Sequence, residues 1–241
     1  MTTTQNWNRL AHELGDVLAL AAPPIAITFG ATPPDGVEAF DDPMPAPMPD
    51  GRTGRVPAGC AFWIKSVDRT FSTVAEDHGN CSVGSLTHGF KTLDEVAGNS
   101  DVAALLDTGW VTMDVVPQIP VVSENPGSVT YGPLADTPVD PDVVLLRVNG
   151  KQLMVLHDAM PDMHLEGKPQ CHIVALAKEQ GVVAASVGCA LSRVRTGMSA
   201  NEMTCAIPAA KLREVVAALS TTAGADGQVA SYAGEDARRF S

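Results

Sequence analysis

The apolar residues of the chain change spacing from one segment to the next. In residues 7–22 they recur at helical spacing, which predicts an amphipathic helix that stops at Pro23 and Pro24. Residues 24–29 form a short β-branched and aromatic run closed by Gly30, which is typical of a buried strand. The chain therefore begins with a helix followed by a strand.

The same reasoning predicts further helices over 60–69, 100–106, 151–160, 170–180 and 209–219, and strands over 70–74, 110–116, 143–148, 182–187 and 202–207. Residues 31–59 contain seven prolines, so we expect a long irregular loop there. Residues 76–85 and 188–193 are expected to be glycine-containing loops. The pattern indicates a single α/β (or α+β) domain over residues 1–241.

The predicted elements occur twice in the same order. In each half a strand is followed by a helix that opens with a cysteine, a second strand, a cysteine in a loop, and a strand ending in Ile-Pro. Cys60 and Cys81 are 21 residues apart, and Cys171 and Cys189 are 18 apart. We expect two pseudo-repeated halves, at about 20–140 and 141–220, whose pseudo-twofold arrangement brings these four thiols together.

Thiol chemistry is the main functional signal. No signal peptide is apparent, so we expect a cytoplasmic protein, in whose reducing surroundings the cysteines are not disulfides. Thiolates at Cys60, Cys81, Cys171 and Cys189 are soft ligands suited to an iron–sulfur cluster, zinc or copper(I). Against this, buried cysteines are common core residues, and the spacings match neither Cys-x-x-Cys nor a ferredoxin run. Cys205 lies in an apolar strand and is expected in the core.

The charge of the chain limits its partners. The 16 basic and 28 acidic residues give a net charge of −12, which disfavours nucleic acid and anionic membrane surfaces. We expect no membrane association, since no apolar run is long enough to span a bilayer. A small-molecule substrate fits better. The acidic first half and the charge-balanced second half also permit a homodimer.

Several polar residues flank the cysteines. Asp77, His78 and His88 lie on either side of Cys81, and Arg193 follows Cys189. A histidine beside a thiolate can be a ligand or a proton-transfer group, and an arginine can clamp an anion, although exposed surface residues are an equally simple explanation.

The motifs Cys60-Ala61-Phe62-Trp63, residues 76–89 (Glu-Asp-His-Gly-Asn-Cys-Ser-Val-Gly-Ser-Leu-Thr-His-Gly) and residues 188–193 (Gly-Cys-Ala-Leu-Ser-Arg) resemble the DUF169 family, prokaryotic proteins without a general assigned function. The resemblance spans about residues 20–220. It implies that Cys60, Cys81, His88, Cys189 and Arg193 fall on recurring motif positions, with Cys171 on a weaker one, and so favours a shared site. The proline-rich loop before Cys60 has no counterpart in this resemblance.

We therefore expect an iron–sulfur protein that acts as a redox or Lewis-acid enzyme. In this hypothesis Cys60, Cys81, Cys171 and Cys189 bind the cofactor, and His88 and Arg193 are catalytic. A cluster with four cysteine ligands would be an electron carrier. One with three, whose fourth iron is open or held by His88, could act as a Lewis acid on a small anionic substrate that Arg193 anchors. One alternative is a non-catalytic protein that binds zinc, copper or haem. Another is a thiol enzyme with Cys81 or Cys189 as nucleophile and His78 or His88 as base.

Overall fold

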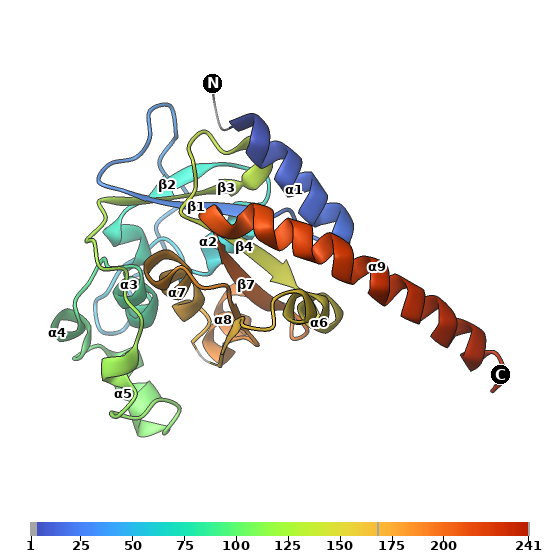
Figure 1. The fold of residues 1–241 in the computed structure, drawn as a ribbon. Coiled ribbons are helices and arrows are strands. Elements are labelled where there is room, and N and C mark those ends of the chain that lie inside the picture. Colours follow the sequence, from blue (N-terminus) through green and yellow to red (C-terminus); the bar gives the residue numbers. More distant parts are fainter. Residues whose placement is uncertain (1–3, 168, 241) are drawn as a thin grey trace.

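One mixed sheet organises the structure, a computed structural model that describes residues 4–167 and 169–240 (Figure 1). Its strands follow the order β2-β3-β1-β4-β7-β6-β5. Neighbouring strands are antiparallel except β5 and β6, which are parallel. The strands are β1 (Ile25–Gly30), β2 (Phe71–Thr73), β3 (Ser128–Pro133), β4 (Val143–Val148), β5 (His164–Glu166), β6 (Ala184–Ser186) and β7 (Met203–Pro208).

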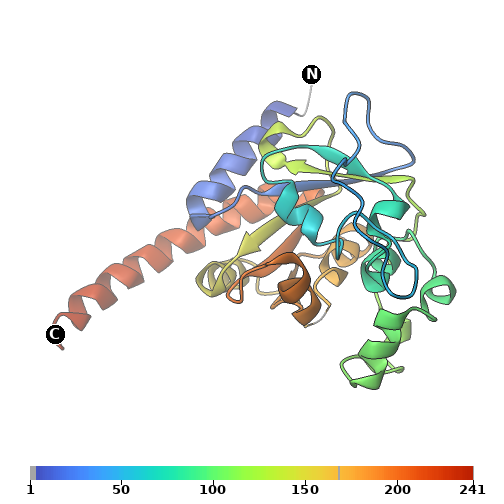
Figure 2. The same cartoon turned by 180° about the vertical axis from the view of Figure 1, so that it is seen from behind.

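Helices cover both faces of this sheet. The views from the two sides show α1, α6 and α9 on one face, and α2, α3, α7 and α8 on the other (Figures 1 and 2). The α-helices are α1 (Thr4–Leu18), α2 (Ala61–Lys65), α3 (Ser82–Thr87), α4 (Leu93–Val96), α5 (Ser100–Asp107), α6 (Gly150–Ala159), α7 (His172–Gln180), α8 (Ala190–Thr196) and α9 (Leu212–Ala237). The described residues also contain the 3-10 turns η1 (Ala75–His78), η2 (Val116–Gln118), η3 (Leu134–Asp136) and η4 (Ala209–Lys211).

The alternation of side chains in the strands builds two apolar layers. In β4, Val143 and Leu145 face the layer that holds α2 and α7, whereas Val144 and Leu146 face the layer that holds α1 and α9. All four are fully buried, as expected for a central strand covered on both faces. Cys205 of β7 lies in the second layer, so the prediction that it is a core residue is confirmed.

Strand order and register repeat on either side of the central β1–β4 pair. Outward from β1 come β3 and β2, and outward from β4 come β7 and β6. The first residue of β1 pairs with the last of β3, Pro133, and the first residue of β4 pairs with the last of β7, Pro208. The expected duplication of the whole halves stays a prediction, but this correspondence gives it better boundaries, Ile25–Pro133 and Val143–Pro208.

Most predicted elements form close to the expected residues, and the strand over 143–148 has the predicted bounds. Three predictions are wrong. Residues 76–85 hold most of η1 and the first part of α3 rather than a loop. Residues 110–116 form turns rather than a strand, so the first half ends its sheet at Pro133 and not at Pro120. Residues 190–196 form α8 rather than a loop. The sequence pattern also missed β3 and β5, and α9 is far longer than expected. No described helix is both long and apolar enough to span a membrane.

Candidate thiol site

Four of the five cysteines occupy equivalent places in the fold. Cys60, Cys81, Cys171 and Cys189 each stand immediately before a helix, at the start of α2, α3, α7 and α8, respectively. Cys60 and Cys171 have helical backbone angles, whereas Cys81 and Cys189 are extended. The fold therefore delivers the four thiols from four separate segments to one face of the sheet.

The four thiols lie close enough to influence one another. If these cysteines lost their protons, the resulting negative charges would repel one another. This repulsion acts between all six pairs among Cys60, Cys81, Cys171 and Cys189. Cys205 lies on the opposite face of the sheet. Burial alone raises its pKa to about 12, with no contribution from another cysteine. The structure thus brings together the four cysteines that the sequence pattern grouped and separates the fifth.

Burial favours the thiol form of three of these groups. It raises the pKa of Cys60 to about 12 and also raises the pKa values of Cys81 and Cys171. A thiolate in apolar surroundings loses the solvation that stabilises it in water. All five cysteines are free, with no disulfide among them. A cation is therefore needed to convert Cys60, Cys81 and Cys171 into thiolates.

Neutral polar groups surround the thiols. The Cys60 Sγ lies 3.1 Å from the Ser192 hydroxyl, which in turn accepts a hydrogen bond of 2.8 Å from Nε2 of Gln170. The Thr87 hydroxyl lies near Cys171 and partly offsets the effect of burial on the pKa of that thiol. Tyr131, buried within electrostatic range of Cys60 and Cys171, has a hydroxyl without a hydrogen-bond partner among the described residues.

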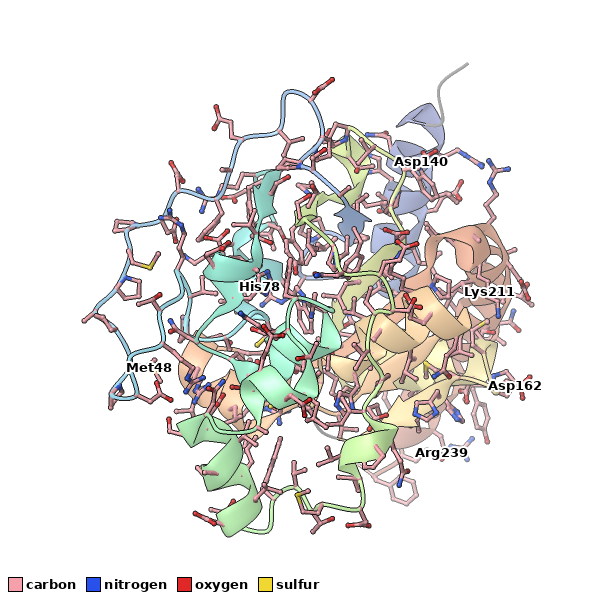
Figure 3. All side chains as sticks on the ribbon, turned by 90° about the vertical axis from the view of Figure 1, so that its left-hand side faces the viewer. Met48, His78, Asp140, Asp162, Lys211 and Arg239 are labelled. Carbon is pink, nitrogen blue, oxygen red and sulfur yellow. The ribbon has the colours of Figure 1, made fainter. Side chains whose placement is uncertain are left out.

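Two buried histidines lie beside this cluster. The rings of His78 and His88 are 5.6 Å apart among aromatic side chains, and Figure 3 shows His78 inside the body. Nδ1 of His88 is 3.0 Å from the Gly84 carbonyl oxygen, to which it donates, and Nε2 has no partner in the described residues. Burial lowers the pKa of His88 to about 4 and that of His78 well below its usual range. Both rings are therefore neutral.

Arg193 holds the backbone around Cys189. One guanidinium nitrogen donates to the carbonyl oxygens of Val187 and Glu202, at 2.9 and 3.1 Å. Gly188 has φ +118°, and a side-chain carbon there would lie 2.5 Å from the Arg193 guanidinium. The glycine thus allows Arg193 to close the loop. Arg195 lies within electrostatic range of the Cys81 thiol.

The cysteine side chains are not arranged as a ready-made metal site. Among the described residues, no group of three or more His, Cys, Asp or Glu side chains is arranged to hold a metal ion. A family model described as "Uncharacterised ArCR" matches residues 13–218 of the chain. The chain belongs to the DUF169 family. No curated protein and no solved structure shows significant similarity to it.

In this DUF169 protein the proline-rich segment, whose role the sequence left open, packs on the Cys81 loop. Nδ2 of Asn80 donates to the carbonyl oxygens of Gly54 and Val56 at 2.8 and 3.1 Å. Arg52 forms an ion pair of 3.0 Å with the buried Asp101 carboxylate, which also accepts hydrogen bonds from Ser82. The segment therefore fixes the residues on both sides of Cys81, while Met48 lies at its outer edge (Figure 3).

Sequence reasoning missed the polar residues around the thiols. Tyr131, Gln170 and Thr87 come from β3, the turn before α7 and the end of α3, and nothing in their local sequence marks them. Gly59, directly before Cys60, is the one residue whose type could have indicated that the chain packs closely on His78. A side-chain carbon at Gly59 would lie 3.0 Å from Nδ1 of His78, so this position needs a small residue.

Replacing Gly79 should destabilise the Cys81 loop. A Cβ at Gly79 would lie 1.9 Å from the Thr53 carbonyl oxygen, so Gly79→Ala forces the two segments apart. We expect a loss of about 2 kcal/mol or more in the free energy of unfolding, measured by urea denaturation. Gly98→Ala is the matched control, since a Cβ there meets no atom within 4 Å. Equal stability of the two variants would contradict this packing.

His88 should make stability depend on pH. Its folded pKa of about 4 is below the value of about 6.5 in the unfolded chain, so acid favours unfolding between these values. Stability is complete above about pH 6.5 and falls as the pH approaches 4. From pH 7.5 to 5.0 His88 should account for about 2 kcal/mol of lost stability. His88→Gln should reduce the loss measured by urea unfolding at the two pH values, and an unchanged loss would argue against a buried neutral ring.

Proposed function

We propose that Cys60, Cys81, Cys171 and Cys189 bind an iron–sulfur cluster. The observation that carries this proposal is the placement of these four cysteines, each directly before a helix on one face of the sheet and within electrostatic range of the other three. Scattered core cysteines would have no reason to converge in this way. Cys205, which is buried as completely as any of the four, stays on the other face of the sheet.

Burial argues for a metal over a free nucleophile. A nucleophilic cysteine acts as its thiolate, and burial raises the pKa of Cys81 instead of lowering it. His78 and His88, the candidate bases, are deeply buried with lowered pKa values. Metal ions deprotonate their cysteine ligands outright, so a metallocofactor supplies the positive charge that the site otherwise lacks.

The surroundings favour a cluster over a single ion. A zinc ion with bonds of about 2.3 Å needs four sulfurs gathered tightly around one centre, whereas the atoms of a cluster themselves separate the cysteine ligands. Hydroxyl and amide groups near thiolates can donate hydrogen bonds to sulfur. The unpartnered hydroxyl of buried Tyr131 and the side chains of Ser192 and Gln170 fit this role.

A redox or Lewis-acid activity is the further part of the proposal. Support for it comes from His88, whose Nε2 has no hydrogen-bond partner among the described residues and carries a lone pair. That lone pair could bind an iron or accept a proton. The rings and groups that contact His88 are Phe29, His78, Thr87 and Gly84, so its role as a ligand stays a prediction. The small anionic substrate has weaker support, because Arg193 already donates to two backbone carbonyls.

Metal content tests the ligand set. After anaerobic purification we expect a brown protein with equal amounts of iron and acid-labile sulfide. Serine at any of Cys60, Cys81, Cys171 or Cys189 should lower both sharply, while Cys205→Ser should retain them. The same iron content in all five variants would overturn the proposal. A colourless zinc protein, a copper protein or a Soret band would instead favour one of the alternative cofactors.

Tyr131 offers a test that does not depend on ligand loss. Tyr131→Phe removes only the hydroxyl, so iron and sulfide should remain while the reduction potential becomes more negative, because hydrogen bonds to sulfur stabilise the reduced cluster. Tyr232→Phe is the control, since Tyr232 is exposed. Redox titration followed by optical or electron paramagnetic resonance spectra measures both. Equal potentials in the two variants would remove Tyr131 from the site.

A further inference from the structure

A cavity of about 590 Å³ lies between two parts of the fold. It is bounded by α3 and α7 on one side and by the segment that carries α4, α5 and η2 on the other (Figure 1). Most of its wall is apolar, from side chains that include Val83, Leu86, Leu105, Val111 and Leu176. This volume lies within the range of about 300–1,000 Å³ typical of small-molecule sites.

The cavity explains why residues 110–116 do not form a strand. Their apolar residues are regularly spaced, but Trp110, Val111, Val115 and Val116 line the cavity rather than the face of a sheet. Two of the lining residues, Leu93 and Val115, are 42 % and 39 % exposed. Apolar side chains that remain in contact with water at a cavity are stabilised when an apolar molecule covers them.

One carboxylate forms part of this apolar wall. Glu166 lines the cavity, and 23 % of its side chain is exposed. Its Oε2 lies 3.1 Å from Nε2 of His164, whereas its Oε1 is 3.7 Å from Nδ1 of His172, which is too far for a hydrogen bond. The two oxygens of a carboxylate together accept up to about four hydrogen bonds. Glu166 therefore retains the capacity to accept a hydrogen bond from a ligand in the cavity.

The charges around the cavity favour a cation. The segment 92–125, from which one wall is built, contains six acidic residues and no Lys or Arg. Two of the six form ion pairs with basic residues outside the segment, and the other four are exposed. The six are Asp94, Glu95, Asp101, Asp107, Asp114 and Glu124. Together with the net charge of −12, this segment attracts a positively charged ligand and repels an anion.

We propose that this cavity binds a small organic amine, whose apolar body fills the cavity and whose ammonium group donates a hydrogen bond to the Glu166 carboxylate. A hydrogen bond between two charged groups is about twice as strong as one between neutral groups, so Glu166 selects an amine over an alcohol of the same shape. None of the four cysteines of the thiol site lines the cavity. The inference therefore does not rest on the proposed cluster, and its ligand has the opposite charge to the substrate considered for Arg193.

Three probes with one carbon skeleton test the ligand class. Biphenyl-4-ylmethylamine is a cation, biphenyl-4-ylmethanol is neutral, and biphenyl-4-carboxylate is an anion. Titration calorimetry with the purified protein at pH 8, where ordinary histidine side chains are neutral, should show saturable binding of the amine. Its affinity should be at least about tenfold higher than that of the alcohol, and the carboxylate should bind most weakly. No saturable binding of the amine, or an affinity no higher than that of the alcohol, would overturn the proposal.

Two matched variants separate Glu166 from the general negative charge. Glu166→Gln keeps the shape of the side chain but removes its charge, so the affinity for the amine should fall about tenfold, while that for the alcohol stays the same. Glu124→Gln removes an exposed carboxylate of the acidic segment that does not line the cavity, and it should change neither affinity. Equal losses of amine affinity in the two variants, with normal circular dichroism spectra, would overturn the role of Glu166.

A third variant places the ligand in the cavity. Val115→Trp puts a larger side chain in the wall and should weaken the amine and the alcohol alike, because the apolar body common to both loses its space. Unchanged affinities for both probes would show that they bind elsewhere and would overturn the proposal. If Glu166→Gln does not fold, the ranking of the three probes by the unaltered protein and the effect of Val115→Trp still decide the question.

Discussion

Burial of four neighbouring thiol groups is the constraint on which the rest of the site depends. Water stabilises a thiolate, and the interior of this protein does not, as the raised pKa of Cys60 shows. The nearest polar partners, Ser192, Gln170 and Thr87, are all neutral. The Arg195 guanidinium acts on Cys81, where the Asp101 carboxylate opposes it. Such surroundings suit a group that brings its own positive charge.

The sheet makes this convergence possible because both of its faces are covered. Alternating side chains in β4 fill two layers, and the layer that contains α2 and α7 is the one in which the cysteines gather. Each cysteine precedes its helix, so the first turn of that helix and the preceding loop fix its backbone. On the Cys81 side the loop is fixed further by the proline-rich segment, through Asn80 and Arg52.

Sequence reasoning worked where burial imposes one simple pattern. Strand 143–148 is apolar on both faces and was predicted to the residue, whereas β3 was missed because Ser128, Gly132 and Pro133 weaken its pattern and its neighbours stabilise it instead. The strand predicted over residues 110–116 was wrong because the wall of a cavity and the face of a sheet both favour regularly spaced apolar side chains. The order of the cysteines predicted that four of them share one region, and these four lie within electrostatic range of one another. Tyr131 could not be foreseen, because its place beside them arises from strand pairing far along the chain.

The central strand pair has a consequence for how the chain could be divided. In the described sheet, the strands of residues 25–133 meet those of residues 143–208 at one place, the β1–β4 pair. A chain cut in the turn around Val139 and Asp140 would give two fragments, each with a freshly exposed, apolar strand edge that matches the other fragment. Each piece alone would be prone to aggregation, whereas co-expressed pieces would complement one another. Since each fragment carries two of the four cysteines, reassembly of the sheet would rebuild the site across a subunit boundary.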